Sequence, residues 1–185
     1  PNHEISKHVA LHGDGVKVLA LWVDNAEDAY DKAIARGAES AYEPIQLSDD
    51  HGFVKMASIK TYGDTIHTLV ERSQYNGAFL PGYQAKKSLA PVRSLGFKYV
   101  DHCVGNVELG DMNKWVKFYE DVMGFKLLVT FDDKDISTDY TALMSKVVSN
   151  GNGFIKFPIN EPAAGKKKSQ IEEYLDFYKG AGVQH

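Results

Sequence analysis

The stretch YVDHCVGNV at residues 99–107 decides how we interpret the fold of this chain. Apolar residues alternate along it, so we predict a buried strand whose residues Val100, His102 and Val104 share one face. A neutral imidazole on an apolar face needs a polar partner, which is either a backbone carbonyl or a metal ion. A second imidazole in the chain, that of His185, favours the metal.

Composition and charge exclude several classes of function. The chain has 185 residues, of which 25% are charged, and a net charge of -4, which is typical of a globular protein with a sizeable core. It has no basic stripe that would neutralise phosphates, so we expect no nucleic-acid partner. Its apolar runs are too short to span a bilayer and its first residues are polar, so we expect no membrane partner. The single cysteine, Cys103, fits a reducing, cytoplasmic location and is predicted to pack in the core.

The first half of the chain is predicted to contain a strand and a helix followed by antiparallel strands. Asp24 and Glu27 have the spacing of a capping box, and Gly37 is expected to end the helix that they begin. A turn at 62–64 joins the last two strands. The predicted elements are a helix at 1–12, a strand at 16–23, the helix between Asp24 and Gly37, and strands at 54–61 and 65–72.

The second half repeats this order after a change in composition. Residues 74–97 are rich in glycine, proline and lysine and lack periodicity. We therefore expect a domain part at 1–78, a linker at 79–97 and a second domain part at 98–185. Beyond the strand at 99–107, the predicted elements are a helix from Asp111 to Gly124, strands at 125–131, 140–149 and 153–160, and a helix that begins with a capping box of Ser169 and Glu172.

A short repeat links the two halves. HGDGVKV at 12–18 and KGAGVQH at 179–185 share a glycine turn that follows a helix and leads into a strand. Val18 stands in the first copy where His185 stands in the second. The repeat predicts duplicated βαβββ units, with a further strand, helix and strands after His185. We therefore expect the chain to be an internal fragment of a longer, duplicated protein.

His102 and His185 are the candidate metal ligands. Paired βαβββ units curl into a half-barrel, and each histidine lies on or at the start of an early strand of such a unit. Two imidazoles on the inner surface suit iron, zinc, copper or nickel, and the residues alone do not choose among these metals. Val18 occupies the ligand position in the first half, so we predict that the histidines of that half bind no metal. These histidines are His3, His8, His12, His51 and His67.

Three longer motifs resemble a known family: VDHCVGNVELGDMNKWVKFYEDVMGF at 100–125, ALMSKVVSNGNG at 142–153 and FPINEPAAGKKKSQIEEYLDFYKGAGVQH at 157–185. Through them the second half resembles the first half of the C-terminal, catalytic domain of the 4-hydroxyphenylpyruvate dioxygenase family, within the vicinal oxygen chelate superfamily. Residues 2–84, with HGDGVKVLALWVD and KTYGDT, resemble the second half of the family's N-terminal, non-catalytic domain. The resemblance implies an α+β fold of paired βαβββ modules that form half-barrels, with each domain only partly present.

This resemblance also implies a non-haem Fe(II) centre that is held by two histidines and one carboxylate. His102 and His185 match the two histidine positions, and the family's glutamate would lie beyond this chain. The centre would leave open positions for a 2-oxo acid substrate and O2. The implied reaction converts 4-hydroxyphenylpyruvate to homogentisate and CO2 in tyrosine and phenylalanine catabolism, and we expect this span alone to be inactive.

Polar residues of the second half match family positions around the substrate. Ser145, Asn160 and Gln170 would orient the substrate, since polar groups in an apolar pocket can bind a phenol and a carboxylate. Each has a simpler interpretation: a serine hydroxyl bonded to the backbone, an asparagine in a turn, and a glutamine in the first turn of a helix. Gln184 is predicted to orient His185, and its alternative is a solvent-facing strand residue.

Two other functions stay open at this point. 4-Hydroxymandelate synthase resembles the family and uses the same substrate, but it oxidises the benzylic carbon. A non-catalytic binding module on the same scaffold would need no metal ligands, so His102 and His185 together argue against it. We further expect the full-length protein to be a homo-oligomer.

Overall fold

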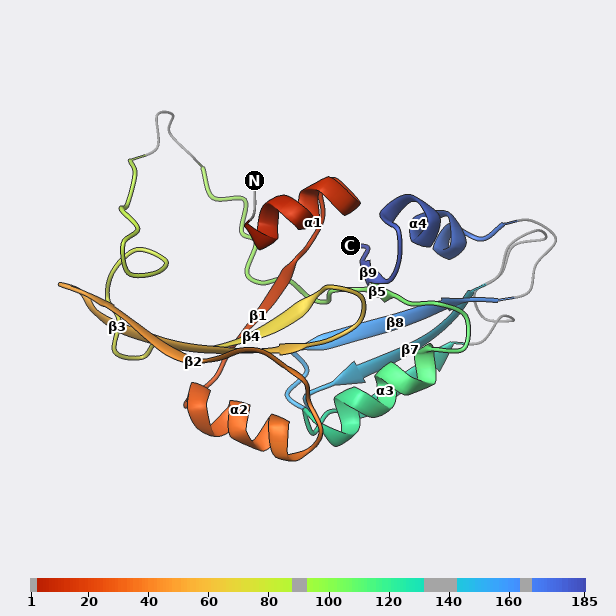
Figure 1. Cartoon of the computed structure of the whole chain (residues 1–185), viewed down its shortest axis with the longest axis horizontal. Coiled ribbons are helices and arrows are strands. Elements are labelled where there is room, and N and C mark those ends of the chain that lie inside the picture. The colour runs from red at the N-terminus through yellow and green to blue at the C-terminus, as the bar shows by residue number, and fades with distance from the viewer. Residues whose placement is uncertain (1–2, 88–92, 132–142, 164–167) are drawn as a thin grey trace.

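The structure of this chain, a computed structural model, describes residues 3–87, 93–131, 143–163 and 168–185 (Figure 1). The first half contains α1 (Glu4–His12), β1 (Val18–Trp22), α2 (Ala26–Ala35), β2 (Ser40–Asp49), β3 (Gly52–Lys60) and β4 (Ile66–Glu71). The second half contains β5 (Gly105–Asn106), α3 (Met112–Asp121), β6 (Lys126–Phe131), β7 (Leu143–Ser149), β8 (Lys156–Pro162), α4 (Gln170–Tyr178) and β9 (Gly182–Val183). Within these ranges no helix is long and apolar enough to cross a membrane.

The two halves are built on the same βαβββ unit. The first sheet has the strand order β1-β4-β3-β2, and the second has the order β6-β7-β8-β5-β9. In each unit the first strand lies parallel to the fourth, and the other neighbours are antiparallel. β9 joins the second sheet by pairing antiparallel with β5. The α+β fold of βαβββ units that the sequence predicts is therefore confirmed.

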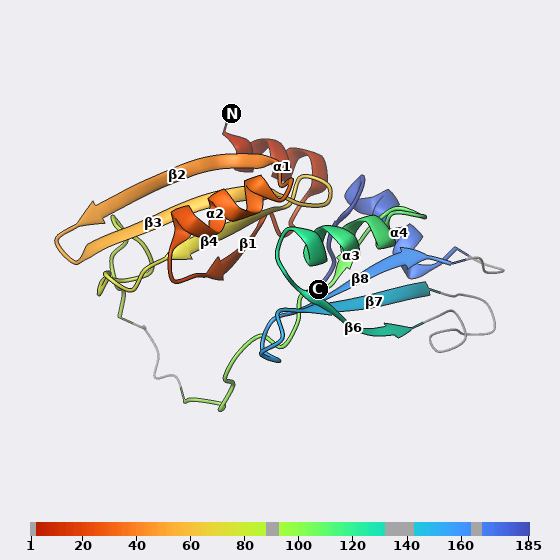
Figure 2. The same ribbon diagram turned by 90° about the horizontal axis from the view of Figure 1, so that it is seen from below.

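Helices lie on both sides of the layer that the two sheets form (Figures 1 and 2). α2 and α3 lie on one side, whereas α1 and α4 lie on the other (Figures 1 and 2). α2 buries Tyr30 and Ala33 in a hydrophobic cluster with Ile59 of β3. α3 packs Tyr119 against Phe157 of β8, with ring centroids 5.3 Å apart. Each unit thus packs its own helix on one sheet face, whereas on the other side α4 contacts β5 and β8 and α1 contacts α4.

A second hydrophobic cluster joins the two halves. Tyr62, in the turn between β3 and β4, is fully buried in the cluster that also contains Val107 and Met112. Its ring centroid lies 5.8 Å from that of Trp115 in α3. Cys103 is partly buried against the same cluster, so its predicted packing in the core is confirmed. Because protein interiors are close-packed, these contacts fix the position of one half against the other.

The prediction of a strand over residues 99–107 is wrong for most of its length. β5 contains only 2 residues, and Val100 is 74% exposed rather than buried. The neighbouring strand explains why residues 99–101 form no strand, because the parallel register with β5 brings the first residue of β8, Lys156, level with His102. In the part of the chain that the structure describes, no strand lies beside the segment before that point, and isolated strands do not form without a partner.

The strand β2 is absent from the elements that the sequence pattern predicts. Its side chains alternate poorly and are mostly exposed, and Pro44 lies within it. β2 is the edge strand of its sheet, where a proline is tolerated because no further strand needs its missing N–H. The pairing register shifts between Tyr42 and Ile45, on either side of this proline. An irregular edge strand gives too weak a pattern to be predicted.

The starts of α2 and α4 test the predicted caps. Asn25 caps α2, and its side chain accepts a hydrogen bond from the amide of Asp28 at 2.8 Å. The prediction of Asp24 as the cap is therefore wrong by one residue, since Asn and Asp are equally favourable caps. The capping box of Ser169 and Glu172 at α4 is confirmed in both of its hydrogen bonds.

The start of α3 is capped from another strand. Asp111 is the N-cap residue as predicted, but its side chain makes no capping hydrogen bond. The buried Glu161 of β8 takes this role, because its Oε2 accepts from the amides of Gly110 at 2.8 Å and Met112 at 3.0 Å. A carboxylate at a helix N-terminus also stabilises the helix dipole. This contact ties α3 to the sheet that carries the candidate site.

Parts of two predictions lie outside the described residues. These parts are 88–92 of the predicted linker and 140–142 of a predicted strand. β7 confirms the remainder of that strand, from Leu143 to Ser149. The described part of the linker forms no helix or strand, and the domain division at 79–97 stays a prediction.

Candidate metal and substrate site

The fold brings His102 and His185 together. β9 pairs with β5, and the ladder continues through hydrogen bonds from Val104 N to His185 O at 2.7 Å and from Gln184 N to Val104 O at 2.8 Å. The two imidazole ring centroids are 5.9 Å apart, with an angle of 79° between the ring planes. Both rings are exposed to solvent. Two residues that are distant in the sequence thus present adjacent imidazoles at one edge of the second sheet.

Each of these imidazoles has a neighbour that fixes its proton. His102 Nδ1 lies 2.9 Å from Asp101 Oδ2, and His185 Nδ1 lies 2.7 Å from Gln184 Oε1. Carboxylate and amide oxygens only accept hydrogen bonds, so both Nδ1 atoms carry a proton, and in the neutral tautomer the lone pair of each ring lies on Nε2. A hydrogen bond from Lys156, followed by that from His102, holds the pKa of Asp101 below its usual value. This arrangement is the one that metal-binding histidines use.

The first half supports the segment that carries His185. Gly63 packs directly on this segment, and a Cβ atom at that position would lie 2.1 Å from the carbonyl oxygen of Ala181. Tyr174 of α4 donates a hydrogen bond from its hydroxyl to the carbonyl oxygen of Val183 in β9, at 3.1 Å. The backbone leading to His185 is therefore held from two sides, which limits how far its imidazole can move relative to His102.

A buried polar row crosses the second sheet. Ser145 of β7 pairs with Asn160 of β8, which pairs in turn with Asn106 of β5. All three side chains are buried, and Asn160 Nδ2 donates to Asn106 Oδ1 at 3.3 Å. By the alternation of strand residues, the row lies on the sheet face opposite that of Val148 and Ile159, which pack against α3. The interpretation of Asn160 as a turn residue is wrong, since it lies inside β8.

Asn106 is the residue of this row that sequence reasoning missed. Its side chain is completely buried, and its Nδ2 has no hydrogen-bond partner among the described residues. An unpaired buried amide donor costs free energy, so binding of a group that accepts a hydrogen bond from Asn106 Nδ2 would be favoured. The sequence did offer one indication of its position. Asn106 is four residues after His102, so in the predicted strand both side chains would lie on the same face.

The two predicted glutamines are both exposed. Gln170 is the first residue of α4 and is exposed, so its substrate role stays a prediction. Gln184 is exposed and its Oε1 contacts His185 as described above, and the orienting role predicted for it stays a prediction. The substrate roles of Ser145 and Asn160 also remain predictions, as does metal binding by His102 and His185.

Comparison with known proteins shows what the chain is similar to. Residues 99–185 match the family described as the Glyoxalase/Bleomycin resistance protein/Dioxygenase superfamily. The 4-hydroxyphenylpyruvate dioxygenase of Yarrowia lipolytica is 49% identical over 187 residues, which cover 98% of this chain and 48% of the relative. That of Dictyostelium discoideum is 46% identical over 189 residues, which cover 100% of this chain and 52% of the relative.

The chain is a homologue of the 4-hydroxyphenylpyruvate dioxygenases. It spans about half the length of these curated relatives. A solved structure of a 4-hydroxymandelate synthase mutant from Streptomyces coelicolor is 27% identical and matches 100% of this chain and 52% of that chain, with a TM-score of 0.83. The family resemblance and the fold predicted for this dioxygenase homologue are therefore confirmed.

Proposed function

We propose that the full-length protein is a non-haem Fe(II) dioxygenase that converts 4-hydroxyphenylpyruvate and O2 to homogentisate and CO2. The observation that carries this proposal is the pair His102 and His185, with ring centroids 5.9 Å apart, in a chain 49% identical to a 4-hydroxyphenylpyruvate dioxygenase. The reaction belongs to tyrosine and phenylalanine catabolism. Its substrates are a 2-oxo acid and O2.

His102 and His185 would hold the iron through their Nε2 atoms. Their Nδ1 atoms are already engaged by Asp101 and Gln184, so the lone pairs needed for a metal lie on the remaining ring nitrogens. The third ligand is proposed to be a glutamate outside this chain. When bound, Fe(II) would accept the 2-oxo acid as a chelating ligand and activate O2, and two histidines with one carboxylate leave positions for both.

The residues of the buried row would orient the organic substrate. Ser145 and Asn160 offer a hydroxyl and an amide in a dehydrated environment, where hydrogen bonds are strong and directional. Asn106 holds Asn160 through the bond at 3.3 Å and has an amide donor to spare. Gln170, at the start of α4, is proposed to contact the substrate from the helix. Gln184 would hold the ring of His185 in the orientation that points its Nε2 atom toward the metal ion.

A second candidate is 4-hydroxymandelate synthase activity. The solved 4-hydroxymandelate synthase mutant aligns with the whole chain at a TM-score of 0.83, which favours keeping this candidate. A non-catalytic binding module is the third candidate, and it would need no iron. All three hypotheses predict different products or metal contents, so a single preparation separates them.

The test is a product analysis of the full-length protein. The protein is purified, loaded with Fe(II) and given 4-hydroxyphenylpyruvate, and O2 uptake, CO2 release and aromatic products are measured. Homogentisate supports the proposed dioxygenase, 4-hydroxymandelate supports the synthase, and absence of both iron and turnover supports the binding module. Cell fractionation and light scattering of the same protein test the proposed cytoplasmic location and homo-oligomeric state.

A further inference from the structure

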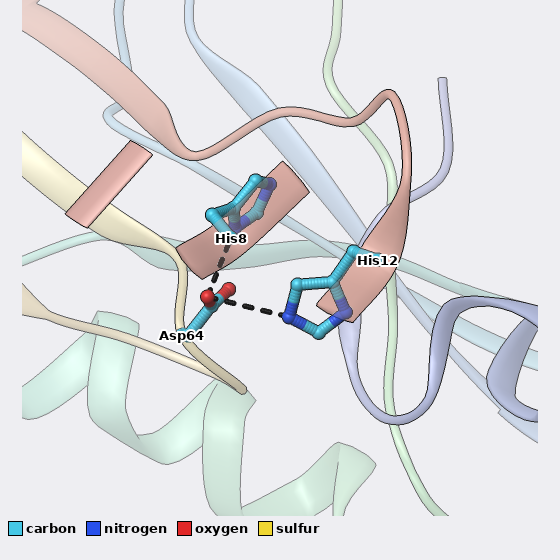
Figure 3. Close-up of side chains that lie close together, drawn as sticks. All are labelled: His8, His12 and Asp64. Atoms are coloured by element: carbon cyan, nitrogen blue, oxygen red, sulfur yellow. Dashed lines mark hydrogen bonds and ion pairs between the residues drawn. The ribbon is translucent and has the colours of Figure 1, made fainter. Parts of the chain in front are cut away.

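A second group of metal-binding side chains lies in the first half. His8 and His12 are one turn apart on α1, so their rings point the same way, and both are buried. Asp64, in the turn between β3 and β4, faces both rings (Figure 3). The ligand atoms of the three residues lie within 4.8 Å of one another. These three residues are called the α1 cluster below.

The hydrogen bonds of His12 leave its Nε2 atom without a partner among the described residues. Its Nδ1 contacts the carbonyl oxygen of Tyr178 at the end of α4, and a carbonyl only accepts, so Nδ1 carries the proton. A neutral His12 then has a lone pair on Nε2. This buried Nε2 has no hydrogen-bond partner among the described residues, yet it lies 3.3 Å from Asp64 Oδ2. Two lone pairs that face each other at this distance repel unless a positive charge lies between them.

The charge state of Asp64 makes this requirement stronger. Burial alone would raise its pKa, but the hydrogen bond from His8 and the charge of Lys17 together lower the pKa below its usual value. The carboxyl group is therefore ionised at neutral pH. Its Oδ1 is buried and has no hydrogen-bond partner within the described ranges, so the carboxylate keeps unused acceptor capacity.

The distances from the Asp64 carboxylate to the two imidazole nitrogens fit a single small cation. Asp64 Oδ2 lies 2.9 Å from His8 Nδ1 and 3.3 Å from His12 Nε2. Ligand atoms that each lie roughly 2.0–2.2 Å from a zinc ion are separated from one another by about 3–3.5 Å. Two imidazole nitrogens and one carboxylate oxygen are also the ligand types that zinc accepts, with a fourth position left open.

The surroundings of the α1 cluster supply the outer contacts of a metal site. Tyr178 O accepts from His12 Nδ1, and Tyr178 OH lies 3.4 Å from His8 Nε2. Such contacts to the distal ring nitrogen orient metal-binding histidines. A cavity of about 530 Å³ reaches one member of the α1 cluster, since its lining includes Asp64, Lys17 and Glu4.

We propose that His8 Nδ1, His12 Nε2 and Asp64 Oδ2 bind one divalent cation of the zinc class. The ion would link α1, the β3–β4 turn and, through Tyr178, the end of α4. This inference departs from the sequence prediction that His8 and His12 bind no metal. It does not depend on the proposed dioxygenase function, because the α1 cluster shares no residue with the proposed iron site.

Lys17 competes with this cation and provides a sharp test. Its Nζ lies 3.3 Å from Asp64 Oδ2 and donates to the carbonyl oxygen of Asp64 at 2.6 Å. A lysine charge at this distance offsets part of the attraction of the carboxylate for a metal ion. Lys17→Met removes the charge and keeps most of the apolar stem. We expect it to tighten zinc binding by about tenfold or more.

The experiment measures zinc binding in the full-length protein with its proposed iron site removed. In a His102→Ala, His185→Ala background, equilibrium dialysis against Zn²⁺ should give one zinc per chain. His12→Gln and Asp64→Asn should weaken this binding roughly 100-fold or more, since even the loss of an outer contact costs about 10–100-fold. The matched control is His67→Gln, a fully buried histidine of the same half outside the α1 cluster.

Two results would overturn the proposal. The first is no zinc in the background protein, in which case a second proton on His12 supplies the positive charge. The second is zinc binding that survives both His12→Gln and Asp64→Asn. Should these variants fail to fold, zinc-soaked crystals of the unmodified protein decide the matter. An anomalous zinc peak within the α1 cluster supports the proposal, and no peak there contradicts it.

Discussion

The two histidine pairs of this molecule have the same side chains but opposite surroundings. His8 and His12 lie one turn apart on a single helix, are buried, and face the carboxylate of Asp64. His102 and His185 come from distant parts of the sequence, are exposed, and have Nδ1 neighbours that are adjacent in the chain. The comparison teaches that residue type alone does not define the function of a metal site. The burial of the two histidines, and whether a carboxylate already faces them, decide whether the pair can enclose an ion or leave ligand positions open.

The difference also separates structural from catalytic chemistry. A buried group with its carboxylate in place can close around an ion and hold three segments together, as structural metal sites do. An exposed pair of imidazoles leaves ligand positions free for a substrate. We therefore expect iron chemistry at His102 and His185 and only a structural role for the α1 cluster.

Removal of the exposed pair should have the largest effect. In the full-length protein, we expect His102→Ala or His185→Ala to abolish stoichiometric iron and lower turnover at least about 1,000-fold. His8→Gln should leave the iron content near that of the unmodified protein. Iron analysis and O2 uptake measure both effects. Full iron content in the His102 and His185 variants would refute the assignment of the iron site.

A third buried histidine sharpens the comparison through its pH dependence. Burial lowers the pKa of His67 to about 4, and its Nδ1 donates to Leu19 O while its Nε2 accepts from Tyr119 OH. An unfolded histidine titrates near 6.5, so the stability due to neutral His67 is present above about pH 6.5 and is lost as pH falls toward 4. We expect this loss to reach about 2–3 kcal/mol at pH 4.5.

Urea denaturation at pH 7 and pH 4.5 measures that loss. In His67→Gln the difference between the two pH values should shrink by this amount. In His51→Gln, the exposed control, the difference should stay unchanged. An unaltered pH dependence in His67→Gln would mean that His67 is not held neutral by its surroundings.

The polar row gives the next effect in size. We expect Ser145→Ala and Asn160→Ala to lower turnover, or to change the product, by roughly tenfold to 100-fold, because a lost positioning hydrogen bond is worth about 1–3 kcal/mol. Iron content should stay near that of the unmodified protein. Ser149→Ala is the matched control, since this buried serine of β7 accepts from Gly151 N instead. Loss of iron in both variants would assign them to the metal rather than to the substrate.

The helix caps give the smallest predicted effect. Asn25→Ala should lower the free energy of unfolding by about 1 kcal/mol, because Asn25 accepts from the amide of Asp28 at 2.8 Å. Asp24→Ala, one residue earlier, should change it by less than about 0.5 kcal/mol. Thermal or urea unfolding of the two variants measures the difference. Equal losses in both would contradict the cap that the structure assigns.

Local patterns predict the elements of the two units and the family motifs well. The turn between β3 and β4, the capping box of Ser169 and the glycine turn before β9 all depend on neighbouring residues, so a sequence pattern records them. The α1 helix shows the limit. Its spacing is correct, but Ile5 and Val9 are exposed and His8 and His12 are buried, because the partners Asp64 and Tyr178 come from other segments.

Contacts between distant segments explain the other failures. Glu161 caps α3 from β8, and residues 99–101 of the predicted strand lie before the point at which β8 begins. Nothing near Asn106 in the sequence indicates that Asn160 will lie beside it. The candidate iron ligands could be predicted because family motifs record a distant contact that local periodicity does not.

Anomalous diffraction from crystals of the full-length protein at the iron edge tests the central claim most directly. We predict an iron peak between His102 and His185, about 2.0–2.3 Å from an Nε2 atom of each ring. The α1 cluster should give no iron peak under the same conditions. An iron peak at His8, His12 and Asp64 instead, or separation of the His102 and His185 rings by more than about 8 Å, would contradict the account, because a shared ion cannot span that distance.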